Sequence, residues 1–152
     1  MPRVVRLTTL AELDACEAAW RTLDARVGGP MEQFDWVRSC AATLGTGQQL
    51  NITTVWRGDR LVAVAPMQIA PRGGVRRASL IGVERHYEPM DLLYEDEAAL
   101  AVLVDEFVFG RQSVRTKVLT VAREDGPLDV ASGRTARAWQ DDPFALEEIA
   151  DG

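Results

Sequence analysis

Residues 49–57 alternate between two sets of side chains with a period of two, which predicts a β-strand. One set is Leu50, Ile52, Thr54 and Trp56, and the other is Asn51, Thr53 and Val55. A tight turn is predicted next, where Gly58 can take a positive φ. Residues 61–69 are almost wholly apolar, as in a strand covered on both faces. A second turn and a third strand over residues 76–81 complete a predicted antiparallel meander.

Two amphipathic helices are predicted before this meander. Residues 10–27 carry an apolar stripe with helical spacing, and Thr9 and Glu12 match a capping box at its start. Residues 30–44 carry a second stripe, with Gly45 suited to the C-terminal cap. The first stripe is Leu10, Leu13, Cys16, Trp20, Leu23 and Val27, and the second is Met31, Phe34, Val37, Ala41 and Leu44.

The order of all the elements favours one fold class. The remaining predictions are a strand over residues 4–7, a loop over 83–89, an extended segment over 90–94, a helix over 95–109 and a strand over 117–122. The order β-α-α-β-β-β-α-β predicts an α+β (layered α/β) fold with a central, mostly antiparallel sheet flanked by helices. We expect residues 1–122 to form the domain and residues 123–152 an acidic, partly mobile tail.

Charge and composition restrict the classes of function. The 152-residue chain has a net charge of −6. Fifteen of its 17 basic and 15 of its 23 acidic residues lie in residues 1–123, so the excess negative charge belongs to the tail. This distribution offers no basic face for nucleic acid. No apolar run approaches the ~20 residues that cross a bilayer, and no signal peptide is recognisable. We therefore expect a cytoplasmic protein without membrane insertion.

The loop at residues 84–88 is the densest group of side chains able to move protons. His86 is the single histidine, and its ordinary pKa suits acid–base chemistry near neutral pH. Glu84 can act as a base, as can the second glutamate of the loop, and Tyr87 can act as an acid. Asp91 can orient either group. The alternative is a polar surface loop without catalytic function. Cys16 and Cys40 have no ligand-like spacing, so no metal site is expected.

The predicted helices and strands also carry a distinctive spacing of large side chains. Trp20 and Leu23 lie in the first helix, and Pro30, Phe34 and Trp36 in the second. Residues 54–67, residues 76–82, and Tyr87 with Asp91 add further motifs. Together these motifs resemble the N-terminal half of CelD/BcsL-like proteins, which are GNAT-fold acetyltransferases linked to cellulose and exopolysaccharide synthesis and related to the FemAB aminoacyltransferases.

This resemblance spans about residues 5–122 and implies a fold, a reaction and partners. The implied reaction is acyl transfer from acetyl-CoA to an amine or hydroxyl of a sugar or cell-envelope precursor. Longer members of the family look like two GNAT-like halves in tandem, and this chain matches the first. The implied partners are a small-molecule or sugar acceptor and either a second GNAT-like half or a second copy of the chain. The alternative is a non-catalytic half that binds a substrate or partner.

The segments expected to bind CoA depart from the family pattern. A GNAT site holds the diphosphate with backbone N–H groups of a glycine-rich turn before a helix. The corresponding residues 81–87 contain one glycine, Gly82, with acidic residues nearby. Residues 71–77 contain more glycine and several arginines, but a strand follows, so a hairpin turn is expected there. The sequence therefore assigns no CoA-binding residues, and acetyl-CoA is implied by the resemblance alone.

Overall fold

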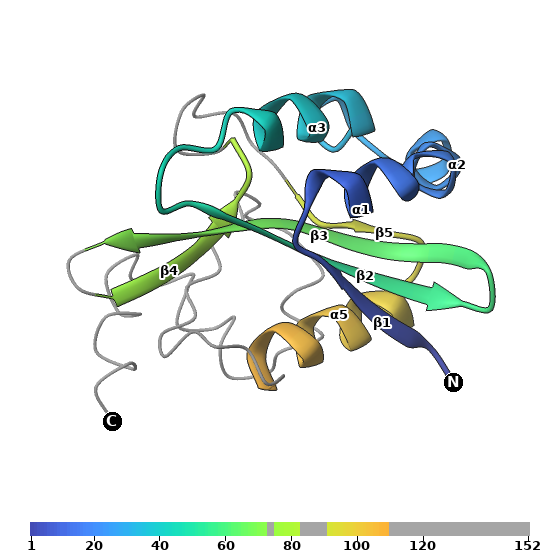
Figure 1. Ribbon diagram of the computed structural model, residues 1–152. Coiled ribbons are helices and arrows are strands. Elements are labelled where there is room, and N and C mark those ends of the chain that lie inside the picture. The colour runs from blue at the N-terminus through green and yellow to red at the C-terminus, as the bar shows by residue number, and fades with distance from the viewer. Residues whose placement is uncertain (73–74, 83–90, 110–152) are drawn as a thin grey trace.

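The computed structural model describes residues 1–72, 75–82 and 91–109, which form one antiparallel sheet with helices on both faces (Figure 1). The sheet order is β1-β2-β3-β4, and β5 also pairs with β3. Every pairing is antiparallel. The elements are β1 (Arg3–Leu7), α1 (Leu10–Ala15), α2 (Glu17–Val27), α3 (Phe34–Ala42), β2 (Gln49–Arg57), β3 (Arg60–Arg72), β4 (Val75–Leu80), β5 (Leu93–Tyr94) and α5 (Glu97–Phe109).

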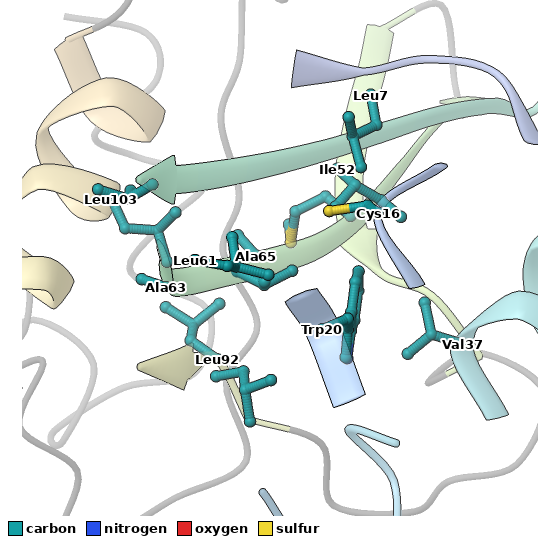
Figure 2. Close-up of a cluster of buried hydrophobic side chains, with 14 of the residues drawn as sticks. Leu7, Cys16, Trp20, Val37, Ile52, Leu61, Ala63, Ala65, Leu92 and Leu103 are labelled. Atoms are coloured by element: carbon teal, nitrogen blue, oxygen red, sulfur yellow. The ribbon is translucent and has the colours of Figure 1, made fainter. Parts of the chain in front are cut away.

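The predicted fold class is confirmed. Figure 1 shows α1, α2 and α3 on one face of the sheet and α5 on the opposite face. The three strands of the meander lie where their patterns place them, and β3 is covered on both faces. Val62 and Val64 of β3 have no exposed surface (0%). Figure 2 shows part of the apolar core, with Trp20 and Val37 from α2 and α3 and Leu103 from α5.

The prediction of one helix over residues 10–27 is wrong at Cys16. The N–H of Cys16 donates to the carbonyl of Leu13, three residues back, rather than to the residue four back that continues an α-helix. This tightened turn separates α1 from α2, and Figure 1 shows the two helices pointing in different directions. Val27 is 42% exposed despite its place on the apolar stripe, because α2 ends at this residue.

Two further helices begin later in the chain than their patterns predict. The helix expected from residue 30 begins at Phe34, after a turn, and Met31 still packs against the core. The helix expected from residue 95 begins at Glu97, because the Asp96 carboxylate caps it by accepting a hydrogen bond from the N–H of Ala99 (2.8 Å). The strand predicted over residues 117–122 and the tail over residues 123–152 lie outside the described residues.

Candidate functional site at the shared edge of β3

One edge of β3 is shared by two strands. β4 pairs with residues 67–72 of β3, and β5 pairs with residues 63 and 64. Because both are antiparallel to β3, β4 and β5 run parallel to each other. The last bond on the β4 side runs from the N–H of Ile81 to the carbonyl of Pro66 (2.9 Å), and the N–H of Glu95 donates to Val62 (2.9 Å). Both ends of the segment between β4 and β5 therefore meet the same few residues of β3.

The identity of Pro66 explains why the pairing stops here. A directly opposed antiparallel pair can exchange two bonds, with each N–H donating to the other carbonyl. Ile81 donates to Pro66, but proline has no N–H with which to return the bond. Gly82 follows with a φ of 90°, a conformation that a residue with a side chain adopts at a cost. Proline and glycine together release the chain from the sheet at this point.

A buried carboxylate binds the chain at the point where it returns to the sheet. Glu32, between α2 and α3, is only 8% exposed, and its Oε1 accepts a hydrogen bond from the N–H of Asp91 (2.9 Å). The backbone carbonyl of Glu32 accepts a second, buried bond from Trp20 Nε1 (3.0 Å). Asp91 Oδ1 in turn accepts from the N–H of Leu92 (2.7 Å). These bonds fix Asp91 at the entrance to β5.

Two carboxylate side chains pack closely against the glycines of the preceding linker. A Cβ built on Gly29 would lie 2.5 Å from Glu32 Oε2, closer than nonbonded atoms approach. A Cβ on Gly28 would lie 1.8 Å from Asp24 Oδ1. Partial burial raises the pKa of the Asp24 carboxyl, the nearby Arg21 lowers it, and the net shift is upward. The pair of glycines that ends α2 therefore also makes room for two carboxylates.

The structure places one of the four candidate site residues. Asp91 lies beside the shared edge of β3, tied to Glu32. Glu84, His86 and Tyr87 lie outside the described residues, and their roles stay predictions. Sequence reasoning missed Glu32, because it falls off the apolar stripe and resembles any surface acid. Its position three residues after the glycine pair is the available signal, and burial of that carboxylate follows only from the tertiary packing.

Acidic residues occupy the first turn of each described helix. They are Glu12 in α1, Glu17 in α2, Asp35 in α3 and Glu97 in α5. A diphosphate is held by available N–H groups and the positive end of the helix dipole, and an acidic side chain opposes both. The N-termini of the described helices therefore do not fit the diphosphate of CoA.

Charged side chains at the start of α5 form a compact network. Both guanidinium NH groups of Arg57 donate to the Asp96 carboxylate (2.5 and 2.7 Å). Arg57 and the N–H of Ala99 lower the pKa of Asp96 to about 2. The Glu95 carboxylate accepts a hydrogen bond from Arg26 of α2 (3.4 Å) and also forms an ion pair with an arginine of β3. This network anchors the helix that follows the shared edge.

The described residues offer no assembled metal centre. Within residues 1–72, 75–82 and 91–109, no three His, Cys, Asp or Glu side chains are grouped so as to hold a metal ion. Cys16 and Cys40 are not joined in a disulfide, and burial raises the pKa of Cys16. No helix of the described part is both long and apolar enough to cross a membrane.

Comparisons with known proteins add one distant structural likeness. No family model matches the chain, and no curated protein matches it by sequence. Among solved structures, the chain is similar to a ribosomal-protein-alanine N-acetyltransferase from Brucella melitensis biovar Abortus 2308. The match has 12% sequence identity and a TM-score of 0.40, and it covers 90% of this chain and 89% of the other. These values are too low to carry an inference about activity, and the kinship with CelD/BcsL-like and FemAB proteins stays a prediction.

Proposed function

We propose that this chain is a GNAT-type acyltransferase domain that acts on an amine or hydroxyl of a sugar or cell-envelope precursor. The observation that carries the proposal is the shared edge of β3. Both ends of the segment that holds the candidate acid–base groups meet this edge, and loops at strand ends carry binding and catalytic groups disproportionately. The edge has β4 and β5 parallel to each other and a buried carboxylate at the point of return.

In this proposal the residues beside the shared edge serve the acceptor. Acetyl-CoA supplies an activated acetyl thioester. Glu84 accepts a proton from the acceptor while the nitrogen or oxygen of the acceptor attacks the thioester carbonyl. His86 is the other candidate base. Tyr87 gives a proton to the departing thiolate, and Asp91 orients the base. Because the described helix N-termini do not fit a diphosphate, the CoA-binding groups are assigned to none of those helices.

The acidic helix N-termini favour a second candidate function. A GNAT-like half without a diphosphate site can bind a substrate or a partner without catalysis. Its partner would be a second GNAT-like half or another copy of the same chain. In this case Asp91 and Glu32 would organise a binding surface rather than a reaction centre.

Release of the CoA thiol distinguishes the two functions. The chain is incubated with acetyl-CoA and a panel of amino sugars and hydroxyl-bearing envelope precursors, and free thiol is measured over time. The acyltransferase proposal predicts release with at least one acceptor, and a loss of at least ~100-fold in Glu84→Gln or His86→Ala. Asp105→Asn, on an exposed position of α5, serves as the control and should retain full activity. Circular dichroism should show all three variants folded.

Thiol release that no acceptor increases would favour the non-catalytic function. If neither Glu84→Gln nor His86→Ala changes the rate of thiol release, the chain is an acyltransferase but these two residues are not catalytic. Unfolding of Glu84→Gln or His86→Ala would show that the loop is structural.

A further inference from the structure

Arg6 of β1 and Thr53 of β2 are directly opposed on the face of the sheet that α5 covers. The register pairs Arg6 with Thr53, and Thr53 with Ala65 of β3. A terminal nitrogen of Arg6 donates to Glu106 of α5 (2.9 Å), which shows that this row of side chains faces the helix. The ion pair joins residues 100 positions apart in the sequence. It therefore ties the first strand to the last described helix.

Two polar atoms of this row are buried without a partner among the described residues. They are the Nε of Arg6 and the Oγ1 of Thr53. Thr53 has no exposed surface (0%), so bulk water does not reach its hydroxyl. Burial of an unpaired donor or hydroxyl is unfavourable, and such groups in folded proteins are usually satisfied by an ordered water molecule.

The neighbouring residue shows that this is a property of the site and not of threonine in a strand. Thr54 points to the other face, where its hydroxyl donates to the carbonyl of Val5 (2.8 Å). The same hydroxyl accepts a bond from Trp56 Nε1 (2.9 Å). Thr54 is thus fully paired by protein groups, whereas the hydroxyl of its equally buried neighbour has no partner within the described part of the chain.

The chemistry of the row fits a small neutral ligand. Directly opposed side chains on a sheet have Cβ atoms about 4.5–5.5 Å apart, so Arg6 and Thr53 can contact one molecule between them. Ala65, on the other side of Thr53, is buried as well and has a side chain of a single carbon. The positive charge of Arg6 is already balanced by Glu106, which argues against an anion.

We propose that Arg6 and Thr53 bind one internal water molecule beneath α5. The water accepts a hydrogen bond from the Nε–H of Arg6 and forms another with the hydroxyl of Thr53. This bridge extends the Arg6–Glu106 ion pair into a network that connects β1, β2 and α5. Its role is structural, and it does not depend on the reaction proposed above.

Substitution of Thr53 by valine tests the site through the sign of its effect. Valine has nearly the shape of threonine but no hydroxyl. If the water is bound, Thr53→Val breaks the bridge, and the folding equilibrium constant of the full chain in urea should fall about fivefold to tenfold. If the hydroxyl is truly unpaired, valine removes an unfavourable group and the constant should rise, which would overturn the proposal. Thr54→Val calibrates the loss expected for a paired hydroxyl.

A double-mutant cycle with Arg6→Lys tests whether one molecule contacts both residues. Lysine keeps the charge opposite Glu106 but lacks the Nε–H. A shared water predicts that the effects of Thr53→Val and Arg6→Lys are coupled by at least about threefold. Independent effects would overturn the bridge even if each substitution is unfavourable. Should Thr53→Val prevent folding, Thr53→Ser must be more stable than Thr53→Ala, and the reverse order would also overturn the proposal.

Discussion

Glu32 is the buried charged residue that organises the candidate site. Its side chain holds the N–H of Asp91, and its backbone carbonyl holds the indole of Trp20, so one residue links the turn between α2 and α3 to the entrance of β5. A buried carboxylate is stable only when its oxygen atoms are hydrogen-bonded. Its burial next to the shared edge of β3 therefore reflects a specific arrangement rather than an apolar filling of space.

Removal of the Glu32 carboxylate should destabilise the chain. Glu32→Ala leaves the N–H of Asp91 without its acceptor, and we expect the free energy of unfolding to fall by about 1–3 kcal/mol. Glu32→Gln keeps an acceptor oxygen and should lose less. The measurement is urea denaturation at neutral pH, with Asp105→Ala on α5 as a control expected within about 0.5 kcal/mol of the wild type. Equal stabilities for Glu32→Ala and Asp105→Ala would show that the hydrogen bond between Glu32 and Asp91 does not contribute to the free energy of unfolding.

At the scale of the elements, the start of α5 depends on the charge of Asp96. The carboxylate caps the helix and pairs with Arg57, which lowers its pKa from an ordinary 3.8 to about 2. A pKa that is lower in the folded state means that the charged form stabilises folding. This stabilisation is present above pH about 4 and is lost as the pH falls through about 2. Both side chains are more than a third exposed, so solvent screening keeps the contribution small.

Asp96→Asn separates the cap from the charge. Asparagine is an equally good N-cap but does not titrate, so the variant should be slightly less stable than the wild type at pH 7. The difference should be below about 1 kcal/mol. It should shrink toward zero as the pH falls from 4 to 2. The measurement is urea denaturation across this pH range, with Asp105→Asn as the control for loss of an exposed charge. A difference that stays constant across the range would contradict the lowered pKa.

The elements differ in how far the sequence alone predicts them. The meander is predictable because period-two alternation, an apolar run and the turn glycine Gly58 are local signals that agree with the tertiary structure. The break at Cys16 is not, because the apolar stripe continues through it and the change in direction depends on packing against the sheet. The late start of α3 has the same cause: Met31 contacts the core from a turn as well as it would from a helix.

The candidate site also contains residues that the sequence predicts and residues that it does not. The residue types of Pro66 and Gly82 are consistent with the end of a strand pairing, since proline interrupts the ladder of hydrogen bonds and glycine accepts a positive φ. Neither marks the site by itself, because both residues also occur in ordinary turns. Asp91 could be singled out because it follows the polar loop at residues 84–88. The partnership with Glu32 spans 59 positions in the sequence and could not be predicted from local patterns.

At the scale of the whole molecule, ion pairs connect α5 to the sheet and join two helices of the opposite layer to each other. Arg6 joins β1 to α5, and Arg57 joins β2 to the start of α5. On the opposite face, Arg38 of α3 pairs with Asp14 of α1. Ion pairs thus add to the apolar core on both faces of the sheet.

The most direct test of the proposed acyltransferase is a calorimetric titration of the 152-residue chain with acetyl-CoA. An acyltransferase should give saturable heat with one site per chain, and acetyl phosphate, which lacks the CoA moiety, should give none as the matched control. An absence of heat at millimolar acetyl-CoA would contradict the proposal for this chain.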